Sequence, residues 1–176
     1  MAKLQDLKND CPDCDVAERQ LDRVQAFFPR IDTRASALFA IAAGELAIAA
    51  VNIQLDDFKL WYVAAPAALL ALLIVGVFIC LYLCAYPSLE GGANSLIYFR
   101  EIAKLTEAEY LRRYTSYVHT DRLNDLTGQI WRNAQIASLK YSYLKWATIL
   151  LMGSIVPWIA TLLATSLTHW TTPAVS

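Results

Sequence analysis

Three long stretches of the chain contain almost no charge. They cover residues 35–54, 60–88 and 147–176, and Glu45 is the only acidic or basic side chain in the first. About 20 apolar helical residues cross the roughly 30 Å of hydrocarbon in a bilayer, and a backbone in lipid must satisfy its own hydrogen bonds. The pattern predicts transmembrane helices at 35–54, 60–86 and 143–167.

The first of these helices has the weakest pattern, because it is rich in alanine and contains a carboxyl group near its centre. A buried helix of a soluble protein is the alternative for this stretch. Composition favours the membrane: 57% of the residues are hydrophobic and 18% charged, against roughly 45–50% and about 25% in soluble domains.

The polar parts of the chain also have helical patterns. In residues 1–34, charges alternate and Ala17, Leu21, Val24 and Phe28 follow helical spacing, which predicts an amphipathic helix with a kink near Pro29. This segment lacks the apolar core of a secretory signal. The tail, 168–176, is expected to be external.

Residues 88–142 are predicted to form a cytoplasmic helical segment. A short helix is expected over 96–105, and Thr106 with Glu109 forms a capping box that opens a second helix to about Tyr117. From Thr120, helical spacing of apolar residues continues into the third span. The predicted fold is therefore an all-α membrane protein with three transmembrane helices and a helical cytoplasmic segment, whose long helix is continuous with the third span. The apolar stripe of this long helix has three possible partners: the N-terminal helix, the 96–117 hairpin or another subunit.

Lys and Arg residues fall mainly before the first span and between the second and third. The first loop has only Lys59, and the tail after Leu167 has none. The positive-inside rule then places the N-terminus and 88–142 in the cytoplasm, with the C-terminus outside.

Motifs for catalysis or metal binding are weak in this sequence. Cys11 and Cys14 form a C-P-D-C pattern, but a zinc site needs further ligands, so ordinary reduced cysteines are expected. No nucleophile elbow, P-loop, H-E-x-x-H or dinucleotide fingerprint occurs. We predict no catalytic residue, metal or cofactor, and no nucleic-acid partner.

Glu45 is a candidate functional residue, because a carboxyl group at mid-bilayer is costly unless it is neutral, paired or facing water. It lies beside a stripe of small residues that lets a second helix approach closely. That stripe consists of Ser36, Ala40 and Gly44. A role in packing or permeation and a neutral Glu hydrogen-bonded within the bundle both remain open.

Three segments resemble the Pycsar effector transmembrane family: RIDTRASALFAI at 30–41, SLIYFREIAKLTEAEYL at 95–111 and DLTGQIWRNAQIASLKYSYL at 125–144. Glu45 differs from the small or apolar residue expected in commoner members. The positions matching the family pattern are Asp32, Arg34, Ala35, Tyr98, Phe99, Glu109, Tyr110, Gln129, Lys140 and Tyr141.

The resemblance implies a multi-pass effector of the bacterial inner membrane that serves antiphage defence and impairs membrane integrity in abortive infection. The resemblance also implies that a partner cyclase makes its ligand, a cyclic pyrimidine mononucleotide. The effector would lie in the lipid bilayer and form a homo-oligomer. Arginines suit a phosphate and aromatic rings suit a base. The candidates are Arg100, Arg112, Arg113, Arg122, Arg132, Tyr98 and Trp131.

Two other functions fit the same sequence. One is a non-enzymatic anchor or scaffold whose long helix docks a soluble partner, and the other is a small constitutive channel or transporter subunit. The base of the ligand, the number of subunits and the route of leakage, through a pore or by bilayer disruption, stay open.

Overall fold

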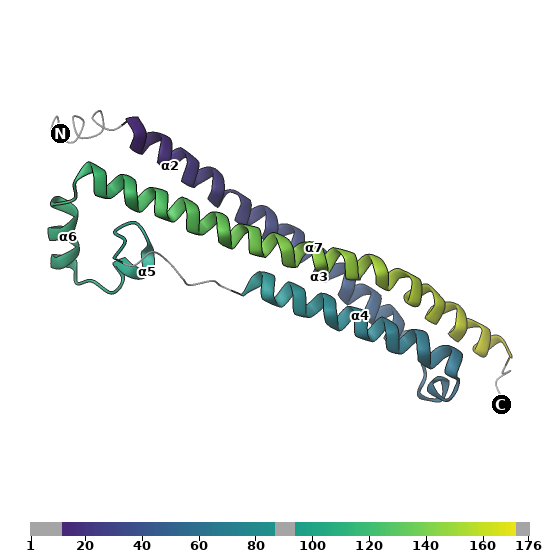
Figure 1. Cartoon of the computed structure of the whole chain (residues 1–176). Coiled ribbons are helices and arrows are strands. Elements are labelled where there is room, and N and C mark those ends of the chain that lie inside the picture. The colour runs from purple at the N-terminus through teal and green to yellow at the C-terminus, as the bar shows by residue number, and fades with distance from the viewer. Residues whose placement is uncertain (1–11, 87–93, 172–176) are drawn as a thin grey trace. The chain divides into compact units, whose positions relative to one another are not determined.

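The computed structural model describes residues 12–86 and 94–171, and these form two compact units (Figure 1). Unit 1 comprises the chain up to Arg30 and from Pro87 to Leu139, and unit 2 comprises Ile31–Tyr86 and Lys140–Ser176. Every regular element in the two described ranges is a helix, and the last helix, α7, runs without a break from His119 to Thr171. The predicted fold class, including the long helix that continues into the third span, is confirmed.

Unit 1 is built around a small apolar cluster between α2 (Pro12–Gln25) and the beginning of α7. Cys14, Ala17 and Leu21 lie one helical turn apart on α2 and are buried against Leu126. Ile97, Leu123 and Ile130 pack on the edge of the cluster. Of the three possible partners for the apolar stripe of the long helix, the N-terminal helix therefore occupies it within unit 1.

The helix break near the end of α2 falls earlier than Pro29. Helix α2 ends at Gln25, Ala26 is a turn residue, and α3 (Phe27–Asn52) begins at once. Pro29 is the third residue of α3, and a proline is tolerated there because the first N–H groups of a helix have no intrahelical acceptor. The predicted kink at Pro29 is thus a break three residues before it.

The segment before α7 is less helical than its sequence suggests. Instead of a helix over 96–105, only α5 (Phe99–Ile102) forms. The hydroxyl of Ser95 accepts hydrogen bonds from the amides of Ile97 and Tyr98, at 3.1 and 2.9 Å. Side-chain acceptors of this kind compete with the helical backbone pattern.

The second predicted helix of this segment is present as α6 (Glu107–Thr115). Its N-cap is Thr106, whose hydroxyl accepts a hydrogen bond from the Glu109 amide at 3.3 Å. The Glu109 carboxylate pairs with Arg113 at 2.6 Å, one turn further along. The helix ends two residues before the predicted Tyr117.

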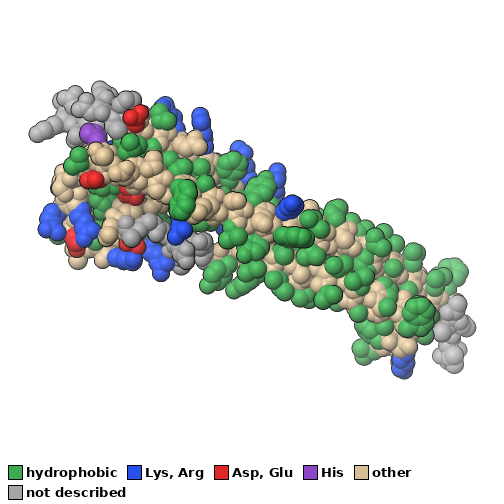
Figure 2. Space-filling model, viewed as in Figure 1, with side chains coloured by type: hydrophobic (Ala, Val, Ile, Leu, Met, Phe, Trp, Pro, Cys, Tyr) green, Lys and Arg blue, Asp and Glu red, His purple; other side chains and the backbone are tan. Residues whose placement is uncertain are grey.

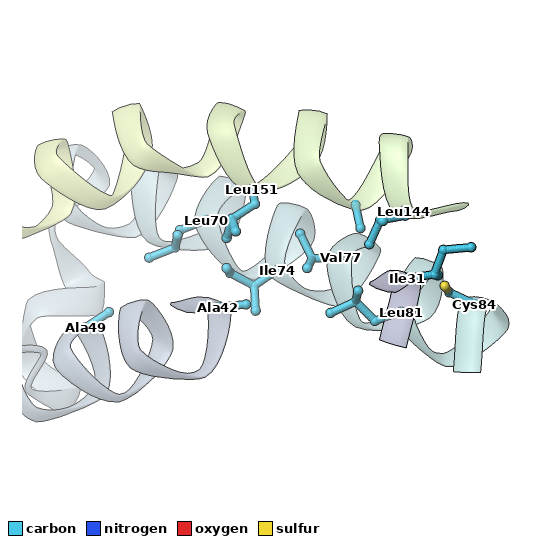
Figure 3. Close-up of a cluster of buried hydrophobic side chains, with 11 residues drawn as sticks. Ile31, Ala42, Ala49, Leu70, Ile74, Val77, Leu81, Cys84, Leu144 and Leu151 are labelled. Atoms are coloured by element: carbon cyan, nitrogen blue, oxygen red, sulfur yellow. The ribbon is translucent and has the colours of Figure 1, made fainter. Parts of the chain in front are cut away.

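Unit 2 is a bundle of three helices: α3 from Ile31, α4 (Trp61–Ala85) and α7 from Lys140. Its core is a continuous row of aliphatic side chains, among them Ala42, Leu70, Ile74, Leu144 and Leu151 (Figure 3). Outward-facing side chains of the bundle are mainly hydrophobic, whereas charged side chains gather over unit 1 (Figure 2). All three helices are long and apolar enough to cross a membrane, so the chain is a membrane protein.

One end of the bundle is closed by a short 3₁₀ helix, η1 (Leu55–Lys59), between α3 and α4. Asp57 is buried there: its carboxylate accepts from the Gln54 amide at 2.8 Å and from the Thr168 hydroxyl at 3.4 Å. The loop is thereby bonded to the last turns of α7.

Candidate functional site

Glu45 lies inside the three-helix bundle, only 9% exposed. Its carboxylate accepts a hydrogen bond from the Ser154 hydroxyl at 2.6 Å, and its backbone carbonyl accepts from the Trp158 indole N–H at 3.0 Å. Both donors come from α7. Since lipid offers no hydrogen-bond partners, these contacts provide the polar environment that the carboxyl group needs at this depth.

The small-residue stripe on α3 does not take part in this bundle. Ser36 and Ala40 are exposed, and a Cβ added at Gly44 would meet no atom within 4 Å. No other helix of unit 2 approaches the stripe closely among the described residues. Its surface is therefore open to lipid or to a second copy of the chain.

Helix α7 carries a row of buried hydroxyl groups that the sequence analysis missed. Ser154, Thr161, Thr165 and Thr168 are all buried and lie seven, four and three residues apart, on one face of the helix. The hydroxyls of Thr161 and Thr165 donate to the carbonyls four residues earlier, at 2.7 and 3.1 Å. Their spacing was the available signal, because three-and-four periodicity of polar residues in an apolar helix marks an inward face.

The other end of the bundle joins four residues of the family pattern in two pairs. The guanidinium of Arg34 donates to the Tyr141 hydroxyl at 2.9 Å. The carboxylate of Asp32 lies 3.8 Å from the Lys140 ammonium. Both pairs link the beginning of the α3 span to the same part of α7, so the pattern reflects a contact between two helices. Ala35, the third family-pattern residue on α3, packs against the apolar core.

A polar junction connects the separate segments of unit 1. The carboxylate of Asp125 on α7 accepts from the Tyr117 hydroxyl at 2.7 Å and from the Leu96 amide at 2.9 Å. Gln129, one turn further and buried, donates to the Ser95 hydroxyl at 3.2 Å. Burial and the hydrogen bond to the Asp125 carboxylate raise the pKa of Tyr117 well above its usual value.

The five arginines predicted to contact a nucleotide all lie in unit 1, on α5, α6 and α7. Two of them hold carboxylates: Arg113 pairs with Glu109, and Arg122 pairs with Glu18 of α2. Arg132 donates to Gln135 at 3.4 Å. Arg100 and Arg112 are exposed.

The aromatic candidates belong to the same unit. Trp131 is 61% exposed, and the Tyr98 ring lies 5.0 Å from that of Phe99. Tyr110 pairs with Tyr114 on α6, with ring centroids 5.7 Å apart. Arginines and aromatic rings are thus present together on unit 1, the combination that a nucleotide requires.

The expectation of ordinary reduced cysteines is wrong for Cys14. It is buried in the unit 1 cluster and takes part in a disulfide, whereas Cys80 and Cys84 of α4 are free thiols. Cys11 lies outside the described residues. Within residues 12–86 and 94–171, no group of three or more His, Cys, Asp or Glu is placed to hold a metal ion.

One known family model matches most of the chain. A family model described as the Pycsar effector protein domain matches residues 16–166, which include α2 from its second turn and nearly all of α7. The chain belongs to the Pycsar effector family. The resemblance noted in the sequence is therefore confirmed, and the protein is an effector of Pycsar antiphage defence, acting downstream of the cyclase. No curated protein and no solved structure matches it.

Proposed function

We propose that this Pycsar effector is a membrane switch that opens the permeability barrier when a cyclic pyrimidine mononucleotide binds to its unit 1 helices. The match over residues 16–166 carries this proposal, because it joins the polar unit and the apolar spans in one effector domain. In this proposal, unit 1 is cytoplasmic, where it meets the product of the cyclase, and the C-terminus is outside.

The nucleotide would be held by unit 1 arginines that bond its phosphate and by an aromatic ring that stacks on its base. Arg112 supports this role because it is exposed on α6. Arg122 is a second contact if a phosphate displaces Glu18 from its ion pair. Such a half-exposed pair is worth only about 0.2–1 kcal/mol, so an anionic ligand competes for it at little cost.

The response would be a change in how the spans pack in a homo-oligomer. Glu45 and Ser154 join α3 to α7 by a buried polar contact, while Ser36, Ala40 and Gly44 leave an open face on α3. In the proposed response, copies of the chain associate through that face and the hydrogen bond between Glu45 and Ser154 breaks. The Glu45 carboxylate and the buried hydroxyls of α7 would then line a path for ions.

One experiment tests this function in cells. Membrane potential and growth are measured in bacteria expressing the protein with and without a pyrimidine cyclase, using a catalytically dead cyclase as the control. Depolarisation only with the active cyclase supports the switch. Toxicity without any cyclase would instead indicate a constitutive channel, and no response in either case would indicate a scaffold.

Binding is tested with two double variants, Arg112→Ala with Arg113→Ala and Arg122→Ala with Arg132→Ala. Each lost charge-assisted hydrogen bond should weaken the affinity for cyclic CMP or cyclic UMP by roughly 1.5–3 kcal/mol. Calorimetry on the detergent-purified chain measures it, with Arg19→Ala, an exposed position on α2, as the control. Unchanged affinity in both double variants would make these arginines ordinary surface residues.

Orientation is tested separately by placing a cysteine after Thr171 and labelling intact cells with a membrane-impermeant maleimide. Labelling from outside is expected, because the positive-inside rule leaves the end without Lys or Arg external. A residue that reacts only after the cells are broken would reverse the orientation.

A further inference from the structure

A small groove lies on the surface of unit 2, where α3 and α7 meet. It has a volume of about 280 Å³ and its polar wall is formed by Arg34, Tyr141 and Lys145. The remaining wall is mainly apolar, formed by Ala37, Leu38 and Leu144 together with Thr148. The Thr148 hydroxyl donates to the Leu144 carbonyl of its own helix. A groove with cations on one side and aliphatic side chains on the other suits a ligand that is itself both anionic and apolar.

The two cations of the groove are available to an anion. Arg34 donates one N–H to the Tyr141 hydroxyl, which leaves further donors of its five on the guanidinium. In the described part of the chain, neither Arg34 nor Lys145 forms an ion pair with a carboxylate. The nearby carboxylate of Asp32 is paired with Lys140. Two positive charges therefore lie over an apolar floor without compensation.

The position of the groove along the helices matches the edge of a bilayer. Arg34 directly precedes the apolar part of α3, where Glu45 is the only ionisable side chain, and Lys145 is the last Lys, Arg, Asp or Glu before the apolar part of α7. Trp146, beside Lys145, is 56% exposed, and exposed tryptophans are typical of the membrane interface. The polar wall thus lies at headgroup level and the apolar wall continues toward the acyl chains.

We propose that this groove binds the phosphate group of an anionic phospholipid, with Arg34 and Lys145 as its ligands and the glycerol and upper acyl chain against Leu38 and Leu144. The position of the groove at the edge of the apolar spans favours a lipid over a free nucleotide, because the apolar wall continues toward the acyl chains. Basic pockets between membrane helices are suited to anionic headgroups.

Tyr141 has a positioning role in this site. Its hydroxyl holds the Arg34 guanidinium on the α7 side of the groove, and the side chain is 45% exposed, so its ring can flank a headgroup. Binding a lipid here would fix α3 to α7 at the end of the bundle where both helices enter the membrane. This site does not depend on the nucleotide proposed above.

The proposal is tested by native mass spectrometry of the full chain in non-ionic detergent, titrated with phosphatidylglycerol and, separately, with phosphatidylcholine. Loss of one charge-assisted contact typically weakens binding about tenfold or more. Lys145→Ala should therefore weaken phosphatidylglycerol binding about tenfold, and Arg34→Ala with Lys145→Ala should weaken it further. Lys59→Ala is the matched control, because Lys59 is an exposed cation of the same unit that does not line the groove. Its ammonium pairs with the Asp56 carboxylate at 2.7 Å. The Lys59→Ala variant should bind the lipid as the unchanged chain does.

A further variant, Tyr141→Phe, and circular dichroism of every variant distinguish loss of lipid binding from loss of the folded structure. Tyr141→Phe should weaken phosphatidylglycerol binding less than Arg34→Ala while the helix content stays constant, and Arg34→Lys should restore part of the binding that Arg34→Ala loses. The single Lys145→Ala variant decides the case if the double variant does not fold.

Three results would overturn the proposal. Phosphatidylglycerol could bind Lys145→Ala and the unchanged chain equally, or phosphatidylcholine could bind as tightly as phosphatidylglycerol. Cyclic CMP could also displace the lipid and lose its own affinity in the double variant, in which case the groove would be a nucleotide site instead.

Discussion

Glu45 in unit 2 is buried and Asp125 in unit 1 is half-buried. Both carboxylates accept a hydrogen bond from a hydroxyl group, but they have different tasks. In unit 2, Glu45 receives the Ser154 hydroxyl at 2.6 Å and joins two helices that also share a large apolar core. In unit 1, Asp125 receives the Tyr117 hydroxyl at 2.7 Å and the Leu96 amide at 2.9 Å. Asp125 thereby joins segments that have little apolar surface in common.

The size of the apolar cores explains the difference. Among the described residues, the unit 2 cluster contains eleven buried residues and the unit 1 cluster four. Unit 1 must therefore rely more on directional polar contacts to fix its α5 and α6 segments on α7. In unit 2, tight packing holds the helices, and the polar contact supplies a partner for a carboxyl group that lipid cannot solvate. The predictions below measure this contrast.

The largest effect is expected from Asp125→Ala. The change leaves the Leu96 amide and the Tyr117 hydroxyl without their acceptor, and hydrogen bonds to a charged group are worth about 1.5–3 kcal/mol each. We expect the local stability of the 94–117 segment to fall by about 3 kcal/mol. Hydrogen exchange of the Leu96 amide in the full chain measures this, since its protection should be largely lost.

Asp121→Ala is the control for that experiment, because Asp121 is exposed on the same helix. Its effect on the Leu96 amide should be small. Unchanged protection in Asp125→Ala would show that the segment is held by other contacts, and the two units would then be alike in depending on packing.

The second prediction concerns Glu45 and Ser154. A double-mutant cycle with Glu45→Ala and Ser154→Ala should give a coupling free energy of about 0.6–1.7 kcal/mol, the range for hydrogen bonds between membrane helices. Unfolding by sodium dodecyl sulfate in mixed micelles measures it. The control cycle combines Glu45→Ala with Thr161→Ala, because the Thr161 hydroxyl donates to the Pro157 carbonyl of its own helix. Equal coupling in both cycles would contradict a specific contact between α3 and α7.

The sequence predicts the helices of this protein far better than the contacts between them. The three spans and the continuous α7 follow from long apolar runs and unbroken helical spacing, signals that are local in the chain. The N-cap at Thr106 is local as well. The prediction of a helix over 96–105 was wrong because the Leu96 amide donates to Asp125, almost thirty residues away. The next two amides donate to the Ser95 hydroxyl.

The candidate site could be predicted only in its residue types. Glu45 was recognisable as a buried carboxyl group, since its depth in an apolar stretch makes exposure to lipid costly. Its partners Ser154 and Trp158 lie more than a hundred residues away, and a single sequence has no signal for such a pairing. The same holds for Arg34 with Tyr141, which the family pattern included without giving their contact.

The third prediction uses pH to probe the junction of unit 1. The pKa of Tyr117 is raised in the folded chain by burial and by the hydrogen bond to Asp125. A group with a raised folded pKa contributes its stability fully below the unfolded pKa, which is about 10 for tyrosine, and loses it as the pH rises from there toward the folded value. Unit 1 should therefore lose stability above about pH 10.

Tyr117→Phe should remove this alkaline loss and cost about 1 kcal/mol at neutral pH, because one hydrogen bond is missing. Circular dichroism during thermal unfolding between neutral and alkaline pH compares the variant with the unchanged chain, and Tyr114→Phe, an exposed tyrosine of α6, is the control. The same alkaline slope in Tyr117→Phe as in the unchanged chain would assign the loss to other groups.

The smallest effect is expected from the ion pair of Arg122 and Glu18, which joins α7 to α2 in unit 1. Both side chains are about two-fifths exposed, so water screens their attraction and a double-mutant cycle should give only about 0.2–1 kcal/mol. The coupling should shrink further as salt is added, because exposed charges are screened. The Asp125–Tyr117 coupling should change much less, since its donor is a neutral hydroxyl rather than a second charge. A salt-independent coupling well above 1 kcal/mol for the Arg122 pair would place it among the contacts that hold unit 1 together. The pair would then be too strong for a nucleotide phosphate to displace Glu18, and the phosphate would have to be bound by Arg112 and the other arginines.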